Sequence, residues 1–285
     1  MTDAPRDDHP DAPSSASAQD PVRLARRLER ERAARQEAEA IAERVTGELY
    51  GALQELTAVN ASLRDFVAVA AHDLRAPLTR VLGYASLLRK RWDSLKADHR
   101  RDFIDGIERG GRQLERLVDD LLTISSIEAG ALHTRAEAME LRAVVDLAIE
   151  SAARNTPVKL EVGSDLVVFA DPDHVRRVLV NYLSNAVKYG APPLELRAKS
   201  VNGWIDVRVS DQGEGVPDEF VPRLFDRFAR AEDARSKGLE GTGLGLAIAR
   251  GLARTNGGDA WYERHGSGGA CFVLRVPQTT LDAAA

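Results

Sequence analysis

The residues with the clearest chemical potential are a histidine and its acidic neighbour, His72 and Asp73, in the run Val69–Thr79. An imidazole is substantially neutral at cellular pH, so a ring nitrogen can act as a nucleophile. A neighbouring carboxylate can accept the hydrogen of the other ring nitrogen, which fixes the tautomer and takes up the positive charge that develops. Single histidines on helices are mostly plain surface residues. The acid beside His72 and the proline five residues later, Pro77, favour a chemical role.

Two asparagines form a second candidate site more than a hundred residues further along the chain. Asn181 and Asn185 lie four residues apart, so on a helix both amides project from one face. Neutral amide oxygens suit Mg²⁺, a hard cation that keeps several waters and is otherwise held by substrate phosphates. The alternative is a pair of asparagines on a solvated helix face, and the spacing alone does not decide between the two.

An acidic residue and two glycines follow in the run Asp211–Gly215. Asp211 comes after the alternating strand Ile205–Val209, so its carboxylate stands at a strand end, where a loop can meet a ligand. There it can accept a hydrogen bond from the exocyclic amine of adenine, a contact that distinguishes adenine from guanine. Gly213 and Gly215 let the backbone approach the base closely. By itself this pattern is most often an ordinary turn.

Three more glycines, Gly241, Gly243 and Gly245, precede a segment with helical periodicity. The free amides and the dipole at such a helix start favour phosphate. A dinucleotide-binding motif does not fit, because position 246 is leucine where that motif has glycine and the preceding segment is polar rather than a strand. No lysine followed by serine or threonine stands after these glycines to complete a P-loop.

The order and spacing of these four segments resemble the H, N, G1 and G2 boxes of the two-component sensor histidine kinases, over roughly residues 60–278. The resemblance implies an ATP-dependent protein-histidine phosphotransferase with ATP and Mg²⁺ as cofactors. It would phosphorylate His72, with Asp73 as the second catalytic residue, and pass the phosphoryl group to an aspartate of a response regulator receiver domain. The residues that the resemblance assigns to the ATP site are Asn181, Asn185, Lys188, Tyr189, Asp211, Gly213, Gly215, Phe228, Arg230, Gly241, Gly243, Leu244 and Gly245.

Within that set the resemblance makes Asn185 the metal ligand, with Asn181 as its supporting neighbour. Lys188 would lie near phosphate oxygens and Tyr189 against the adenine. The run 224–228 is similar to the family's F box, whose aromatics hold the lid over the nucleotide, and Arg230 could reach the γ-phosphate. The lid itself, residues 231–240, should be mobile until ATP binds.

The sequence departs from the family pattern at a few points. Ala76 stands at the fourth position after the histidine, where members with strong phosphatase activity often carry threonine or asparagine, so phosphatase activity should be weak. Ala229 replaces an aromatic residue that is common in the lid. No periplasmic, PAS-like or GAF-like segment precedes residue 21. The signal is therefore expected to enter through residues 1–65, an upstream sensor protein, or the catalytic domain.

The helix that must carry the histidine is predicted to be long. Apolar residues recur in alternating steps of four and three from Leu24 to Ala70, an a/d seam broken only by Glu31 and Arg35. A single helix leaves so narrow an apolar stripe uncovered, so the seam predicts a parallel homodimer. The alternative is a single exposed, charged helix.

Around His72 the seam takes three successive steps of four, a stutter that locally unwinds a coiled coil. Pro77 adds to the disturbance, because it lacks an amide donor and crowds the carbonyl of Asp73. His72 falls off the seam and should face outward. A turn at Asp93–Asp98 and a second amphipathic helix over Phe103–Ile124 then predict a helical hairpin, and two such hairpins form a four-helix bundle.

The remainder of the chain alternates between helical and strand patterns. Helices are expected at 141–153, 172–189 and 242–255. Strands are expected at 158–163, 166–170, 194–200 and 203–210, with a closing hairpin around 260–262 and 270–276. Helices on one face of a mixed, mostly antiparallel sheet make an α+β domain. The family resemblance specifies a two-layer α/β sandwich ATP-binding domain of Bergerat type.

The predicted fold class is therefore α + (α+β), with an N-terminal dimeric coiled coil, a helical-hairpin four-helix bundle and the ATP-binding sandwich. The expected segments are a disordered tail at 1–20, a coiled-coil signalling helix at 21–65, a dimerisation and histidine phosphotransfer domain at 60–130, a catalytic ATP-binding domain at 137–278 and a disordered tail at 279–285.

The composition argues against a nucleic-acid-binding protein, a reactive cysteine and a membrane protein. A net charge of -5 gives no basic footprint for nucleic acid. The single cysteine, Cys271, lies in an apolar run and is predicted to be a small buried hydrophobe rather than a reactive thiol. Because there is neither a long apolar span nor a basic-then-apolar leader, the sequence predicts a cytoplasmic protein without a membrane span.

Two rival functions remain. A dimeric coiled-coil scaffold with a nucleotide-binding module as a switch would bind ATP and leave His72 unmodified. An ATPase or serine kinase of the same nucleotide-binding superfamily is the second rival, and the helix-borne His72 and Asp73 argue against it.

Overall fold

The computed structural model describes residues 21–230, 241–266 and 268–280. Its longer helices are α1 (Pro21–Arg91), α2 (Ala97–Glu128), α3 (Leu141–Ala152), α4 (Pro172–Tyr189) and α6 (Gly245–Thr255). Its strands are β1 (Glu137–Glu140), β2 (Val158–Glu161), β3 (Val167–Ala170), β4 (Leu194–Val201), β5 (Trp204–Ser210), β6 (Asp259–Arg264) and β7 (Ala270–Pro277). Short 3-10 turns stand at η1 (Trp92–Ser94) and η2 (Val221–Arg223). The tail expected at 1–20, the lid expected at 231–240 and residues 281–285 lie outside the described residues.

The chain divides into two compact units, residues 1–64 and 65–285. In the first unit α1 is a continuous helix, as the sequence predicts. Four of its apolar seam residues are 48–69% exposed in the single chain: Leu24, Leu28, Leu49 and Leu56. An uncovered apolar stripe is what one strand of a coiled coil presents to a partner, and the pairing itself stays a prediction.

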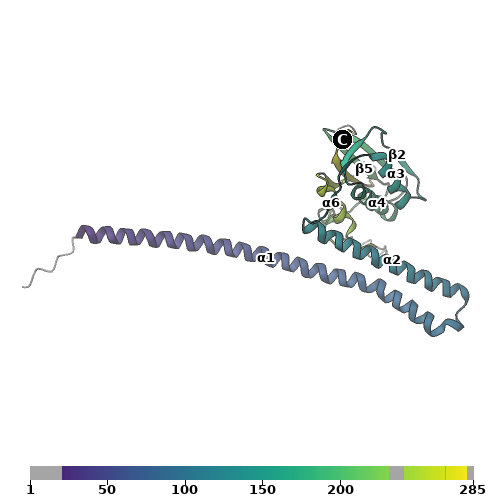
Figure 1. Cartoon of the computed structure of the whole chain (residues 1–285), viewed down its shortest axis with the longest axis horizontal. Coiled ribbons are helices and arrows are strands. Elements are labelled where there is room, and N and C mark those ends of the chain that lie inside the picture. Colours follow the sequence, from purple (N-terminus) through teal and green to yellow (C-terminus); the bar gives the residue numbers. More distant parts are fainter. Residues whose placement is uncertain (1–20, 231–240, 267, 281–285) are drawn as a thin grey trace, which may run out of the picture. The chain divides into compact units, whose positions relative to one another are not determined.

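In the second unit the end of α1 packs against α2 as a helical hairpin (Figure 1). Two glycines on α2 make the close approach possible, since a methyl group at Gly106 would lie 2.5 Å from the ring of Tyr84 and one at Gly110 would lie 2.5 Å from Val81. The Tyr84 ring also stacks on Phe103, with 5.4 Å between centroids. The predicted hairpin is therefore confirmed.

The turn of this hairpin agrees with the predicted one, because α1 ends at Arg91 and α2 begins at Ala97. The helix continues through Pro77 without interruption. The effect of this proline on the coiled coil remains a prediction. At the other end, α2 finishes at Glu128, followed by Gly130 with φ +61°.

A five-stranded sheet of order β2-β4-β5-β7-β6 forms the core of the rest of the second unit. The pair β2 and β4 is parallel and the other pairs are antiparallel. Helix α4 packs on β5 and β7, α6 packs on β6 and β7, and α3 packs on α4 (Figure 1). The inward residues are fully buried and include Leu196, Ile205, Val207 and Leu274. These layers confirm the predicted α+β arrangement.

Two details differ from the sequence-based expectations. Strand β1 was not expected; it pairs with β3 as a separate antiparallel ribbon. The helix expected at 242–255 begins three residues later, at Gly245. Gly243 has φ +69° and the Thr242 hydroxyl accepts the Leu244 N–H, so these residues form a turn instead of the first helical turn.

The hairpin also contacts the helical layer of the sheet through α2 and α6. Arg177 of α4 donates to Asp120 and to Thr123 of α2, both at 2.8 Å. A methyl group at Gly251 of α6 would lie 2.7 Å from Ile127. Within the part of the chain that the structure describes, no helix is long and apolar enough to cross a bilayer.

Candidate functional site

His72 and Asp73 lie side by side on α1. The imidazole is 79% exposed and the carboxylate 24% exposed. Nδ1 of His72 lies 3.3 Å from Oδ1 of Asp73, within hydrogen-bond distance. With the hydrogen on Nδ1, donated to Asp73, the Nε2 lone pair faces solvent. The arrangement therefore exposes an imidazole nitrogen that can act as a nucleophile, with the carboxylate placed to favour the tautomer that carries its hydrogen on Nδ1.

The helix that carries the two asparagines starts at a strong cap. The Asp171 carboxylate accepts the backbone N–H groups of Asp173 at 3.0 Å and His174 at 3.2 Å, and Pro172 occupies the first turn. Although burial acts to raise the pKa of Asp171, hydrogen bonds from backbone N–H groups, including that of Arg135, hold it below its ordinary value. This cap sets where α4 begins and hence which of its residues face outward.

One face of α4 is buried and the other carries the asparagines. The buried residues include Val175, Leu179 and Leu183. Asn181 and Asn185 are half-buried on the other side. A methyl group at Gly245 would lie 2.8 Å from Oδ1 of Asn181, so the amide of Asn181 packs directly on the start of α6. The structure thus brings the N-box and G2 segments together.

Asp211 lies at the end of β5 and is 4% exposed. Its Oδ1 accepts the backbone N–H of Gly213 at 2.8 Å and that of Ala270 at 3.3 Å. Among the described residues both hydrogen bonds fall on Oδ1, so Oδ2 is the oxygen left to accept from a ligand. An exocyclic amine donates hydrogen bonds, so Oδ2 of Asp211 is a suitable acceptor for it.

Gly190, directly after α4, makes room for that carboxylate. A methyl group here would lie 2.4 Å from Cγ of Asp211, and one at Gly213 would lie 2.9 Å from the Cα of Gly190. Any side chain at Gly190 would therefore displace Asp211. The end of the asparagine helix and the Asp211–Gly215 loop are in direct contact.

The F-box and G2 segments also meet. A methyl group at Gly243 would lie 2.7 Å from the carbonyl carbon of Phe228, a buried residue with φ +57°. A methyl group at Gly241 would lie 2.8 Å from the hydroxyl of Tyr189. Leu244 is fully buried and precedes the first residue of α6. The backbone at Gly243 is therefore too closely packed to accept a side chain.

Two basic residues of the predicted site lie next to these contacts in the sequence: Lys188 precedes Tyr189, and Arg230 follows Phe228 by two residues. Lys188 is exposed near the end of α4, and Arg230 is half-buried at the last described position before residue 241. Within the described residues no hydrogen bond or ion pair joins His72 or Asp73 to the predicted ATP-site residues. The structure therefore gathers the N, G1, F and G2 segments but leaves the histidine as a separate site.

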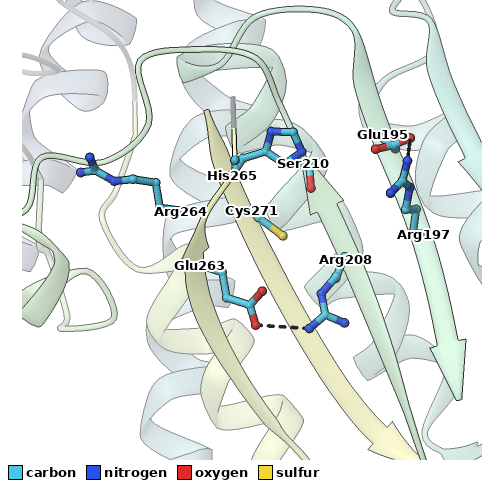
Figure 2. A pocket seen from close by; sticks show the side chains of 9 residues that line it. Glu195, Arg197, Arg208, Ser210, Glu263, Arg264, His265 and Cys271 are labelled. Carbon is cyan, nitrogen blue, oxygen red and sulfur yellow. Dashed lines mark hydrogen bonds and ion pairs between the residues drawn. The ribbon is translucent and has the colours of Figure 1, made fainter. Parts of the chain in front are cut away.

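A pocket of about 230 Å³ lies on the other face of the sheet and belongs to neither site. Figure 2 shows two ion pairs among its lining side chains, Arg208 with Glu263 at 3.2 Å and Arg197 with Glu195 at 2.7 Å. Cys271 is 5% exposed, and burial raises the pKa of its thiol. The prediction that Cys271 is buried is therefore confirmed.

Sequence reasoning missed three residues around Asp211. From the sequence, Gly190 could be recognised only as a glycine that ends a helix. A methyl group at Gly269 would lie 1.9 Å from the Asp211 carbonyl oxygen, and the Tyr262 hydroxyl accepts the Val216 N–H at 3.3 Å. Gly269 and Tyr262 belong to no motif, because each is more than forty residues away in the sequence from the residue that it contacts, Asp211 or Val216.

Comparison with known protein families identifies two domains. Residues 62–130 match the His kinase A (phospho-acceptor) domain, and residues 170–280 match the histidine kinase-, DNA gyrase B-, and HSP90-like ATPase family. The chain is 34% identical over 246 residues to the circadian input-output histidine kinase CikA of Synechococcus elongatus, an alignment that covers 83% of this chain and 33% of that relative. The chain spans less than half the length of the curated relatives it matches.

Two solved structures are similar over most of the chain. The Acinetobacter baumannii histidine kinase AdeS has a TM-score of 0.58 at 23% identity, covering 73% of this chain and 98% of that one, and shows the same fold. The full-length ShkA in complex with AMPPNP has a TM-score of 0.57 at 28% identity, covering 78% of this chain and 47% of that one. With both domain families matched in order along the sequence, this chain belongs to the sensor histidine kinases.

Proposed function

We propose that this chain is an ATP-dependent protein-histidine kinase of a two-component system. It phosphorylates His72 and transfers the phosphoryl group to an aspartate of a response regulator receiver domain. The observation that carries the proposal is the exposed imidazole of His72 beside the Asp73 carboxylate, 3.3 Å away, inside the segment that matches the phospho-acceptor family. The proposal also draws on the ATPase family match in the same chain.

In this reaction Nε2 of His72 attacks the γ-phosphorus of ATP. The N–P bond forms as the bond between the γ-phosphorus and the bridging oxygen breaks, and ADP leaves with that electron pair. The imidazole gains positive charge, which the carboxylate of Asp73 stabilises through the hydrogen on Nδ1. Phosphoryl transfer depends mainly on positioning and charge stabilisation, so these two side chains suffice on the acceptor side.

On the donor side the adenine amine would bond to Oδ2 of Asp211, while Gly213 and Gly215 bring the loop backbone close to the base. Phosphates would lie at the start of α6, whose first amides have no partner inside the helix. Lys188 and Arg230 supply positive charge near phosphate oxygens. These roles are assigned residue by residue from the family motifs.

The half-buried amide of Asn185 fits a Mg²⁺ ligand, because it is a neutral oxygen donor on the outer face of α4 beside Asn181. Magnesium, when bound with ATP, would neutralise charge on the phosphate oxygens. Asn181 would keep the site aligned with α6, since its Oδ1 already lies against Gly245.

The test is incubation of the full chain with γ-labelled ATP and Mg²⁺. A phosphohistidine is acid-labile and alkali-stable, so we expect label with those properties. ATP binding without label would favour the scaffold, and acid-stable label would favour a serine kinase; either result would refute the proposal.

The homodimer expected from the phospho-acceptor domain should depend on the exposed seam of α1. We expect Leu49→Gln with Leu56→Gln to weaken the dimer strongly, because each leucine lost from a buried interface costs about 2–5 kcal/mol. Both side chains are more than 60% exposed in the single chain, so replacing them should remove few contacts within the chain itself. Sedimentation velocity over a concentration series would measure the dissociation constant.

Tyr50→Gln is the matched control for the dimer experiment. Tyr50 lies on the same helix, is 65% exposed and falls off the seam, so its replacement should leave the dimer intact. A double leucine variant that dimerises as tightly as the wild type would show that the α1 seam is not the dimer interface.

Ala76 should make the chain a weak phosphatase towards its response regulator. Hydrolysis of an aspartyl phosphate needs a water held in line with the phosphorus, and a methyl group can neither donate nor accept the necessary hydrogen bond. We therefore expect Ala76→Thr to speed dephosphorylation of the regulator more than it changes phosphorylation of His72. The measurement is the decay of purified phospho-regulator with each variant and without kinase.

Ala76→Val is the control for shape, since it adds nearly the same volume without a hydroxyl. It should leave the decay as slow as with the wild type. Rapid decay with the wild-type chain, equal to that with the threonine variant, would show that another group positions the water.

A further inference from the structure

We infer that Tyr262 of β6 is a positioning residue for nucleotide binding, acting through the loop Asp211–Val216, here called the adenine loop. The inference rests on the proposed function, because it assumes that Asp211 holds the adenine. Tyr262 belongs to none of the sequence motifs and lies in a strand rather than in a loop.

The first observation is a hydrogen bond at the end of the adenine loop. The Val216 backbone N–H donates to the Tyr262 hydroxyl at 3.3 Å. Just before it, Gly215 has φ +73°, and a methyl group there would lie 2.8 Å from the Gly268 carbonyl oxygen and 3.4 Å from the Tyr262 hydroxyl. The end of the loop therefore rests against the hairpin that joins β6 and β7.

The second observation concerns the start of the same loop. The Asp211 N–H donates to the Ala270 carbonyl at 3.0 Å, and the Ala270 N–H donates to Oδ1 of Asp211 at 3.3 Å. The first of these bonds joins backbone to backbone, so pairing with β7 fixes the first residue of the loop. The far end has a side chain as its partner, so a single substitution can release it.

The third observation is that the Tyr262 ring is itself held in place. Tyr262 pairs with Phe272 across the sheet, and their ring centroids lie 5.7 Å apart. Phe272 stacks on Tyr182 at 5.3 Å, and the fully buried Tyr182 donates its hydroxyl to the Val273 carbonyl at 3.2 Å. This aromatic row fixes the Tyr262 hydroxyl as an acceptor at a constant position.

Removal of the Tyr262 hydroxyl should free the end of the adenine loop without disrupting the fold. Tyr262→Phe keeps the ring, the aromatic row and the backbone pairing of β6, so the fold should be preserved. Val216 loses its acceptor, and the end of the adenine loop gains freedom that nucleotide binding must then remove. The expected effect is weaker nucleotide binding at an unchanged rate of phosphoryl transfer, since His72 and Asp73 are not touched.

The experiment compares wild type and Tyr262→Phe in the full chain. Isothermal titration with a non-hydrolysable ATP analogue and Mg²⁺ should show binding weakened about 2- to 10-fold, the usual effect of one lost hydrogen bond. The KM for ATP in autophosphorylation should rise by the same factor, with kcat unchanged.

Trp261→Phe is the control on the same strand. Trp261 lies on the opposite face of the sheet, where its indole N–H donates to Glu263 at 2.8 Å, and it does not bond to the adenine loop. Its replacement should leave nucleotide affinity at the wild-type value.

The outcomes are distinguishable. A wild-type chain that does not bind the analogue refutes the proposed function itself. If the wild type binds and Tyr262→Phe binds equally well, only the role of Tyr262 is overturned. A changed kcat, or an equal loss of affinity in Trp261→Phe, would show a general structural role for β6 and would also overturn the inference.

Discussion

We expect His72→Gln to abolish labelling of the chain by γ-labelled ATP while nucleotide binding persists. Glutamine has no nitrogen lone pair that can attack phosphorus, so the effect is complete rather than graded. Binding should be unchanged because, among the described residues, no hydrogen bond or ion pair joins His72 to the predicted ATP-site residues. Autoradiography of the acid-labile label and titration with an ATP analogue measure the two properties separately.

His99→Gln is the matched control for that experiment. His99 is an exposed histidine on α2 of the same hairpin, so its loss should leave labelling intact. Asp73→Asn should retain the label but slow its formation by roughly 10²–10⁴, the usual contribution of a positioned acid-base group. Acid-labile label that survives in His72→Gln would show that another residue is the acceptor.

The second large effect is expected from Asp211→Asn. Two backbone N–H groups bond to Oδ1 of Asp211, so the asparagine must turn its carbonyl oxygen towards them. Its NH₂ group then takes the place of Oδ2 and faces the adenine amine, donor against donor. We expect ATP affinity to fall about 10- to 100-fold, as for a lost hydrogen bond to a charged group.

Asp206→Asn makes the same chemical change on the same strand. Asp206 is 2% exposed and accepts two hydrogen bonds from Arg275, at 2.6 and 2.9 Å. It is remote from the adenine loop, so its replacement should lower stability and leave affinity unchanged. Affinity within about twofold of wild type for Asp211→Asn, measured by titration, would mean that the adenine binds elsewhere.

The sequence by itself determined the elements that are marked by local signals, such as capping residues and apolar periodicity. Helix α4 runs over 172–189, as predicted, because Asp171 caps it, Pro172 starts it and Gly190 follows it. Strand β5 was recognisable from alternation, since its apolar face packs under the helices and Asp206 and Arg208 lie on its other face. The histidine with its acidic neighbour was also a local feature, because the two residues are adjacent in the sequence.

Tertiary structure decided the features that join distant segments. Strand β1 exists because β3 pairs with it some thirty residues later, and the start of α6 depends on the left-handed turn at Gly243, packed on Phe228. The approach of Gly190 to Asp211 and the bond from Val216 to Tyr262 likewise follow from how the sheet and its helices pack. Periodicity and capping specify which face of an element is apolar and where it ends. Which residues of two elements then touch is set by the packing of complete side chains, and no local pattern encodes it.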